Sequence, residues 1–342
     1  MEDCSVSIVI PAYNSQKTIA QSIEYCLSQT YEACRLETFI VDDGSSDGTA
    51  EIIKKYPVKY IYQNNRGPAA ARNAGWRGAS GEIVCFTDSD CVPEKDWVKK
   101  MVEKYTSETI GAVGGSYDIR NKESLLAECI HEEILQRHRQ IPFETDYLGS
   151  FNVSYRRKVL EEVGGFKSSF KNASGEDNDL SYRVRKAGYR LIFDESIKVG
   201  HYHQTKLFKY LKEQYRHGYW RMMLYRFHPD MMKGDSYAGM SDFVQPPLAM
   251  GIIGILVTST FYKPLSYVAF LLGLLLVVLQ LPITLKGIIR NRRSSYLYLS
   301  LVLFLRAFAR GFGMIKGIWR FFILEAVRNG EKQKYTNHYP RI

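Results

Sequence analysis

Two carboxylates one residue apart, Asp88 and Asp90, follow directly after the apolar run Ile83–Phe86. At the end of a buried strand, two such groups repel each other unless a proton or a cation lies between them. Hard divalent ions such as Mg²⁺ or Mn²⁺ bind one or two carboxylates together with phosphate oxygens of a ligand. The pattern therefore predicts a site for Mg²⁺ or Mn²⁺ beside a phosphorylated ligand, and the adjacent Cys91 is interpreted as incidental.

A second group of acids lies in the sequence GEDNDLSYRVRKAG, residues 175–188. Leu180 and Val184, spaced four apart, predict a helix with a buried stripe. Glu176 and Asp177 fall in its first turn, where the helix dipole favours negative charge. Capping explains one acid there, but not three within four residues. A carboxylate in this turn is therefore a candidate general base.

A third acidic pair, Asp42 and Asp43, begins the sequence DDGSSDGT at residues 42–49. The sequence from Asp43 matches the first six positions of a calcium-binding loop. Lys54 occupies the twelfth position, where such a loop needs glutamate, so we exclude a calcium site. A turn and a helix cap explain the later residues of this sequence, but not two acids at the end of a strand.

Strand and helix patterns alternate through this part of the chain. We expect strands at residues 5–10, 36–41, 58–62 and 83–86, and helices at 18–27, 49–55, 68–75 and 96–105. This alternation predicts βαβ units, an α/β fold and a parallel sheet. Ligands of such sheets bind at the carboxyl ends of the strands. The polar turns at Asn14, at Asp42–Asp43 and at Asp88–Asp90 should therefore surround one crevice.

Six motifs occur in a fixed order over residues 5–203: SIVIPAYN, VDDGSSDGT, NRGPAAARNAG, FTDSDC, GSFNVSYRRKVLEEVGGF and GEDNDLSYRVRKAG. In this order they resemble an inverting family 2 glycosyltransferase. The resemblance implies a GT-A fold, which is a Rossmann-like fold for nucleotide-diphospho-sugar transferases. It also implies a similarity to membrane-anchored bacterial and archaeal enzymes that assemble polysaccharides or glycolipids.

The same resemblance implies roles for single residues. The donor nucleotide-sugar would lie against Pro11, Ala12, Tyr13, Asn14, Asp42, Asp43, Gly67, Arg72 and Asp88. Within this set, Asp43 would accept from the base and Asp88 would approach the ribose or the sugar. Asp177 would be the catalytic base, with Glu176 beside it, and Asn152 would face the sugar and acceptor.

The resemblance also implies a metal ion, Mn²⁺ or Mg²⁺, on the donor diphosphate. Asp90 would hold it, with Asp88 and His201 as further candidate ligands. His201 could equally be only a residue at a strand end. His203, two residues on, would share its face if the chain is extended there.

These roles imply one in-line displacement, which inverts the sugar configuration. The donor would be a UDP-, GDP- or dTDP-sugar, and the acceptor a hydroxyl of a lipid-linked saccharide. A phosphate acceptor, as in polyprenyl-phosphate sugar synthases, is the alternative, although those enzymes characteristically lack the Glu-Asp motif. The alternative function that is not enzymatic is a membrane-anchored sensor of nucleotide-sugars.

The sequence QYRHGYW, residues 214–220, is similar to the QxxRW motif of processive polysaccharide synthases, but it does not match it. Arg216 comes one residue too early, and Tyr219 stands where arginine should precede Trp220. Transfer of a single sugar is therefore favoured over processive synthesis. Trp220 is assigned to the acceptor region.

Hydropathy divides the chain into four expected parts, residues 1–205, 206–242, 243–289 and 290–342. They are a catalytic domain, an amphipathic interfacial region, two transmembrane helices, and a basic loop with a further helix and tail. The two spans are expected at Phe243–Tyr262 and at Pro264–Leu281, continuing apolar to Ile289. Pro246 and Pro247 would lie in the first turn of the first span.

The segment Tyr296–Phe322 is apolar but carries four basic residues within one arc of a helix, Arg306, Arg310, Lys316 and Arg320. We expect it to lie in the membrane interface with this basic face towards lipid headgroups, with a third span as the alternative. The net charge of +10 suits a membrane or phosphorylated ligands. The hydrophobic hairpin argues against nucleic acid. Arg290, Arg292 and Arg293 predict a cytoplasmic loop, and hence a multi-pass protein with its catalytic domain in the cytoplasm.

Overall fold

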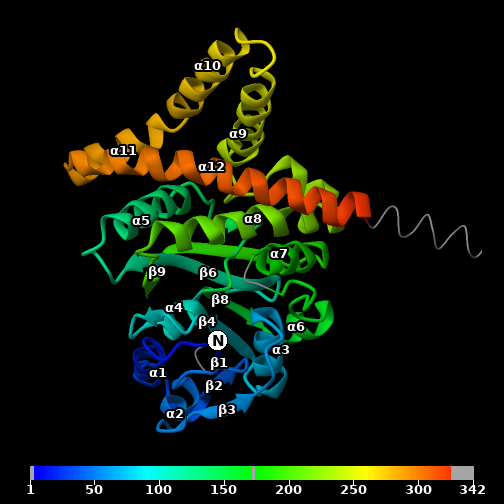
Figure 1. Ribbon diagram of the computed structural model, residues 1–342. Helices are drawn as coiled ribbons and strands as arrows, with labels where there is room; N and C mark the ends of the chain where they lie inside the picture. The colour runs from blue at the N-terminus through cyan, green and yellow to red at the C-terminus, as the bar shows by residue number, and fades with distance from the viewer. Residues whose placement is uncertain (1–3, 172–173, 325–342) are drawn as a thin grey trace, which may run out of the picture. The chain divides into compact units, whose positions relative to one another are not determined.

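The structure is a computed structural model that describes residues 4–171 and 174–324 (Figure 1). The chain forms two compact units. The first comprises Met1–Thr205 and Asp235–Tyr237, and the second comprises Lys206–Gly234 and Ala238–Ile342. The predicted basic tail after Arg328 lies outside the described residues.

One mixed sheet organises the first unit. Its strands are β1 (Val6–Ala12), β2 (Leu36–Asp42), β3 (Lys59–Tyr62), β4 (Ile83–Thr87), β5 (Cys91–Pro93), β6 (Ile110–Ile119), β7 (Glu144–Thr145), β8 (Asn152–Arg156) and β9 (Arg190–His201). Their order is β3-β2-β1-β4-β8-β6-β9-β5, with β7 on β9. The four N-terminal strands are parallel, as the alternation predicted. Beyond them β8 is antiparallel to both β4 and β6, whereas β6 and β9 are parallel.

Helices cover both faces of this sheet (Figure 1). They are α1 (Ile19–Leu27), α2 (Thr49–Ile53), α3 (Pro68–Gly78), α4 (Trp97–Glu103), α5 (Leu125–His138), α6 (Arg157–Val163) and α7 (Glu176–Lys186). Ile8 and Ile10 of β1 pack in one core with α1 and α4, whereas Val9 packs in the opposite core with α3, α6 and α7. Successive strand residues point to opposite faces, so one fully buried strand, with Ser7 as its polar residue, supplies both cores.

A short part of the chain, Asp235–Tyr237, returns from the helical unit to the first unit and is called here the return segment. The Ser236 amide donates to Asp146 Oδ1 at 2.7 Å. Arg137 donates to the carbonyl of Tyr237 at 3.3 Å, and its guanidinium lies 5.4 Å from the centre of that ring. Polar and aromatic contacts thus hold the return segment on the first unit.

The second unit is helical. Its elements are α8 (Leu207–Phe227), α9 (Met240–Thr258), α10 (Leu265–Val278), α11 (Leu281–Asn291) and α12 (Leu297–Ile318), with a π-turn at Trp319–Ile323. Glycines let α8 and α12 cross closely. A Cβ atom on Gly218 would lie 2.1 Å from the carbonyl oxygen of Arg310, and one on Gly313 would lie 2.0 Å from that of Tyr215.

By length and composition, two helices of the described chain could cross a membrane, Leu265–Asn291 and Ser294–Ile323. The first coincides with the expected second span, and the second with the segment expected to lie in the membrane interface, for which a third span was the alternative. The expected first span, residues 243–262, corresponds to a shorter apolar helix, Asp242–Thr258. Pro246 and Pro247 lie inside α9 rather than in its first turn, because the helix begins earlier, at Met240.

The basic face of α12 is placed differently from the prediction. Arg306 is buried inside the second unit. Arg310 donates to Gln214 Oε1 at 2.8 Å and pairs with Asp242. The interpretation that this face points to lipid headgroups is therefore wrong for Arg306 and Arg310, since both pack against neighbouring helices.

Candidate active site

The turns after β1 and β2 are bonded to each other. Asn14, with φ of 50°, accepts from the Ser46 amide at 2.8 Å and donates its own amide to Ser45 Oγ at 3.0 Å. Asp42 is buried and accepts from the Ser45 amide at 2.8 Å and from the Tyr60 hydroxyl at 3.0 Å. Burial, followed by the bond to Asp42, raises the pKa of Tyr60 to about 12. The polar turns therefore form one edge, as the parallel strands require.

Asp43 fixes the loop that precedes α3. Its carboxylate accepts from Gln63 Nε2 at 2.5 Å, from the Arg66 amide at 2.9 Å and from the Gly67 amide at 2.8 Å. Gly67 has φ of 91°, and a Cβ atom there would lie 2.5 Å from the carbonyl oxygen of Lys171. Only glycine fits both conditions. The predicted contact of Asp43 with a nucleotide base stays a prediction beside this structural role.

Arg72, on α3, links two parts of the site. Its Nη2 donates to Asp88 Oδ1 at 2.8 Å and its Nη1 donates to Glu176 Oε1 at 3.0 Å. The guanidinium is 1% exposed and lies 5.5 Å from the centre of the Phe166 ring. A buried charge needs such pairing, because desolvation is costly. The sequence pointed to Arg72 only through the resemblance, and its pairing with Glu176 was not predicted.

The two acids at the start of α7 differ in their surroundings. Glu176 is 1% exposed and accepts from Arg72 and, at 2.7 Å, from the Ser174 amide. Burial and the charge of Asp177 raise the pKa of Glu176 to about 7. Asp177 is partly exposed and accepts from the Tyr147 hydroxyl at 3.2 Å; burial raises its pKa as well. Two neighbouring acids with raised pKa values are typical of a catalytic site.

Asp179, the third acid of this turn, has a structural role. It is fully buried and pairs with Arg183 Nη2 at 2.7 Å and with Lys167 Nζ at 3.3 Å. Tyr147, which contacts Asp177, was not found from the sequence. It follows the short strand β7 in a stretch without any motif, so no local signal marks it.

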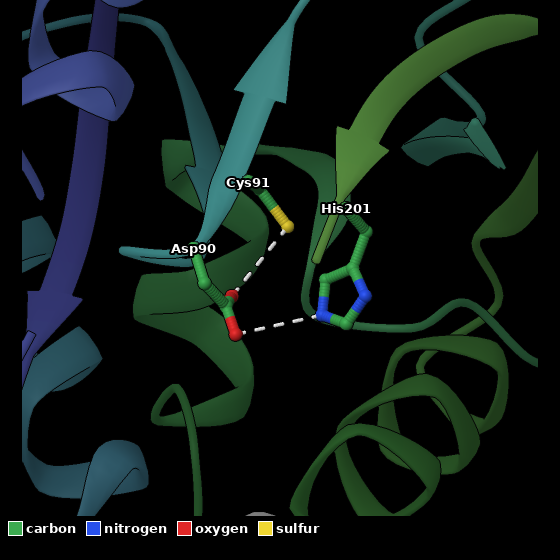
Figure 2. A group of neighbouring side chains, drawn as sticks. All are labelled: Asp90, Cys91 and His201. Atoms are coloured by element: carbon green, nitrogen blue, oxygen red, sulfur yellow. Dashed lines mark hydrogen bonds and ion pairs between the residues drawn. The ribbon is translucent and has the colours of Figure 1, made fainter. Parts of the chain in front are cut away.

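Asp90 points towards His201 at the end of β9 (Figure 2). Its Oδ2 lies 3.6 Å from His201 Nε2, and its Oδ1 lies 3.9 Å from Cys91 Sγ. The three ligand atoms lie within 4.8 Å of one another. Burial opposes ionisation of Asp90, but His201 outweighs it, so the pKa of Asp90 is lowered. Asp88 and Asp90, adjacent in the motif, thus contact different groups.

The donor set of this cluster fits a divalent cation of the hard or borderline kind. A carboxylate and a neutral imidazole suit Mn²⁺, and Asp90 alone with diphosphate oxygens suits Mg²⁺. Cys91 lies closer to this group than the sequence suggested. Burial, with the charges of Asp90 and Asp88, raises the pKa of its thiol far above the usual range, so the thiol stays protonated and is a poor ligand.

The remaining predicted residues differ in accessibility. Pro11 and Ala12 are buried in β1, whereas Tyr13 and Asn14 are exposed. Asn152 is buried and does not face an acceptor. Its side chain accepts from Trp97 Nε1 at 2.8 Å and donates to the carbonyls of Ser116 and Ile197, each at 2.9 Å. All of its polar atoms are therefore used inside the sheet, which corrects the expectation.

Trp220 belongs to the second unit. Its ring packs 6.0 Å from that of Phe321 and 5.1 Å from that of Tyr219. Its assignment to the acceptor region stays a prediction.

Comparisons with known proteins all find similarity to glycosyltransferases. Residues 7–164 match the family model described as Glycosyl transferase family 2. Over 220 residues the chain is 30% identical to glycosyltransferase AglE of Haloferax volcanii, covering 62% of this chain and 71% of that protein. It is also 30% identical to the probable glycosyltransferase YdaM of Bacillus subtilis, covering 55% of this chain but only 48% of the relative.

A poly-beta-1,6-N-acetyl-D-glucosamine synthase of Staphylococcus aureus is 28% identical over 201 residues, again covering 48% of the relative. Among solved structures, the mannosyltransferase PcManGT of Pyrobaculum calidifontis, in complex with GDP-Man and Mn²⁺, superposes with a TM-score of 0.58 at 20% identity. That match covers 93% of this chain and 88% of the other. At this identity the likeness concerns the fold.

Proposed function

Because the chain belongs to glycosyltransferase family 2, we propose that it transfers one sugar from a nucleotide-sugar donor to a hydroxyl of a lipid-linked saccharide. The donor is a UDP-, GDP- or dTDP-sugar, and the reaction is a single displacement with Asp177 as the general base. The protein acts at a membrane, with its catalytic unit in the cytoplasm.

The state of Asp177 is the observation that carries this proposal. Of the three acids in the first turn of α7, Glu176 and Asp179 are buried in ion pairs. Asp177 alone is partly exposed and bonded to a neutral hydroxyl. A base must reach its substrate, and of the three acids only Asp177 is accessible and outside an ion pair. Burial also raises the pKa of Asp177, which makes its carboxylate a stronger base. A phosphate acceptor would be ionised already and would not need such a base.

Asp90 and His201 are the residues that would hold a divalent ion, which would supply positive charge for the departing nucleoside diphosphate. The fold neighbour solved with GDP-Man and Mn²⁺ supports a metal of this class. Arg72 holds Asp88 and Glu176 in fixed positions, so that the donor edge and the base are pre-organised. Asp177 takes the proton of the acceptor hydroxyl, and Tyr147 holds its carboxylate in place.

Membrane attachment rests on the second unit. The described chain has two helices of sufficient length and apolar character, and large apolar side chains such as Phe261, Tyr267 and Phe270 are exposed on the connection and on α10. Exposed apolar surface of this extent is typical of contact with lipid. An acceptor carried on a lipid would then be presented at the same membrane.

Replacement of Asp177 by asparagine tests the proposed base. Asparagine has nearly the same shape but cannot accept the proton. We expect sugar transfer to fall by about 10²–10⁴-fold while the nucleotide still binds. Transfer would be followed with radiolabelled donors and membrane lipids, and nucleotide binding by calorimetry.

Asp96→Asn is the matched control, because this half-buried acid precedes α4 and its carboxylate pairs with Lys100 at the surface. It should leave transfer unchanged. Near-normal turnover in the Asp177→Asn protein would remove Asp177 from the mechanism. Loss of nucleotide binding in that variant would instead give this residue a role in holding the donor.

A further inference from the structure

Three histidine rings form a line that ends at Asp90. His201 Nε2 faces Asp90 Oδ2 at 3.6 Å. On the other side of the ring, His201 Nδ1 lies 3.2 Å from His203 Nδ1, and His203 Nε2 lies 3.3 Å from His131 Nδ1 on α5. His201 therefore faces Asp90 with one nitrogen and His203 with the other. His203 faces His201 and His131 in the same way, and His131 faces His203 with Nδ1.

The middle ring is held firmly. His203 is buried, and its backbone is bonded in both directions to Asn121, which accepts from the amide at 3.0 Å and donates to the carbonyl at 2.7 Å. The Tyr117 ring packs against both His201 and His203, with centroids 4.8 and 5.6 Å away. These contacts keep the nitrogen atoms facing one another.

The pairing of nitrogens restricts where the protons lie. A hydrogen bond between two imidazoles needs one N–H group and one lone pair, and a neutral ring carries one of each. The choice made at one ring therefore fixes the other two. In the first arrangement His131 Nδ1–H donates to His203, His203 Nδ1–H donates to His201, and His201 Nε2–H donates to Asp90.

The second arrangement is the reverse of the first. His201 Nδ1–H donates to His203 Nδ1, His203 Nε2–H donates to His131 Nδ1, and His131 carries its own proton on Nε2. Only in this arrangement does His201 present a lone pair on Nε2 beside Asp90. A carboxylate facing Nε2 favours the first arrangement, and a divalent cation there requires the second.

We propose that His203 and His131 are positioning residues that set the tautomer of His201, and that the three rings reverse their hydrogen bonds together when His201 binds a divalent cation. This rests on the metal-dependent transfer proposed above. Each ring keeps one proton throughout. One proton leaves His201 Nε2 for solvent, two shift between neighbouring rings, and one enters from solvent at His131 Nε2, on a ring that is partly exposed.

The first test reads the protons directly. Full-length protein in detergent, labelled with ¹⁵N-histidine, is compared with and without a nucleoside diphosphate and Zn²⁺, a diamagnetic ion that accepts imidazole ligands. Two-bond ¹⁵N–¹H spectra distinguish Nδ1–H from Nε2–H. We expect the proton to move from Nε2 to Nδ1 on His201, and from Nδ1 to Nε2 on His203 and His131. If any of the three rings keeps its tautomer on saturation with Zn²⁺, the proposal is wrong.

The second test uses affinity for Mn²⁺, measured by electron paramagnetic resonance with a nucleoside diphosphate present. His203→Phe keeps the ring but removes both nitrogens, and should weaken Mn²⁺ binding by about 10–100-fold. His203→Asn keeps an acceptor near the Nδ1 position and should stay within a few-fold of the natural protein. Wild-type affinity in His203→Phe, or equal losses in both variants, would contradict the proposal.

His138→Asn is the matched control. His138 is also buried near Tyr117, with ring centroids 5.9 Å apart, but its Nδ1 pairs with Ser116 Oγ at 2.8 Å rather than with the line of histidines. It should bind Mn²⁺ normally. Neither test uses a sugar donor. A protein that switches its tautomers but transfers no sugar would therefore support the positioning role and contradict only the proposed transfer.

Discussion

At the scale of single residues, the site separates acids that lie close together in the sequence. Glu176, Asp177 and Asp179 share one helical turn, yet one pairs with Arg72, one faces Tyr147 and one pairs with Arg183. Helix geometry sends neighbouring side chains in different directions, so each acid meets a different environment. Burial and partner then set the pKa, and with it the chemistry, of each carboxyl.

The Glu176–Asp177 pair predicts a pH dependence. The two carboxyls interact and titrate as a pair, and the pKa of Glu176 is raised to about 7. The proposed base Asp177 works only when ionised, and burial raises its pKa, so transfer should be lost on acidification at a pH above the usual range of an aspartate. Glu176→Gln removes the neighbouring carboxylate, which lowers the pKa of Asp177 and moves this loss to lower pH.

Tyr147→Phe should shift the same profile in the opposite direction. The Tyr147 hydroxyl donates to Asp177 and stabilises its ionised form, so removing it raises the pKa of Asp177. Both profiles would be measured as kcat/KM for sugar transfer against pH, with the natural protein as reference. Shifts of both variants in one direction would exclude Asp177 as the titrating base.

What the sequence revealed about single residues follows from the range of the contacts involved. Asp88, Asp90 and Asp177 stand at strand and helix ends, and their local patterns predicted them as site residues. Arg72 and Glu176 are more than one hundred positions apart, and their pairing depends on how α3 and α7 pack. Asn152 matched a motif, but its amide is consumed by backbone carbonyls that only the folded sheet brings near.

At the scale of elements, the start of α3 depends on Gly67. A Cβ atom there meets the backbone of Lys171 and also requires φ of 91°. Gly67→Ala should therefore lower the free energy of unfolding by about 1–3 kcal/mol and weaken donor binding, since it displaces the loop held by Asp43. Denaturant unfolding and nucleotide calorimetry would measure the two effects.

Gly188→Ala provides the comparison for this change. Gly188 has φ of 92°, almost the same as Gly67, but no atom within 4 Å of its Cβ position. Alanine at position 188 brings the same backbone strain without the clash. Gly188→Ala should therefore lower the free energy of unfolding by about 1 kcal/mol and leave donor binding intact. Equal losses of stability and donor affinity in both variants would show that the close contact between position 67 and Lys171 does not cause these losses.

The strands that the sequence revealed are those with plain apolar patterns. β1 and β4 are mainly apolar, with Ser7 and Thr87 as their polar residues, and β2 becomes apolar towards its end, as expected of strands covered on both faces. β8 is fully buried but reads Asn-Val-Ser-Tyr-Arg. Its Asn152 accepts from Trp97, and its Ser154 is bonded to Tyr105. Polar residues hidden by tertiary hydrogen bonds give no periodic signal, so its antiparallel pairing needed the structure.

At the scale of the whole molecule, the prediction to be tested is which lipid accepts the sugar. In membranes containing the protein, radiolabelled nucleotide-sugar should label a lipid that already carries a saccharide and should leave added polyprenyl phosphate unlabelled. The reason is that a base at Asp177 is useful only for a hydroxyl. Membranes with the Asp177→Asn protein serve as the blank. Efficient labelling of polyprenyl phosphate would overturn the proposed acceptor.

The membrane segments show where hydropathy alone is insufficient. The apolar run beginning near residue 243 is interrupted at Thr258, where α9 ends, and the longer helical stretch is Leu265–Asn291. Which basic residues of α12 face inward was also not visible in the sequence. Gln214 and Asp242, partners of Arg310, come from two other helices.

The return segment has a consequence for how the protein can be divided. The motifs end near residue 203, so a fragment cut after Thr205 looks self-sufficient. Such a fragment would lack Tyr237, whose ring lies 5.3 Å from that of Tyr147, and Asp235, which accepts from Asn178 at 3.4 Å. Both contacts flank Asp177. A fragment that keeps these contacts around the proposed base therefore extends to residue 237.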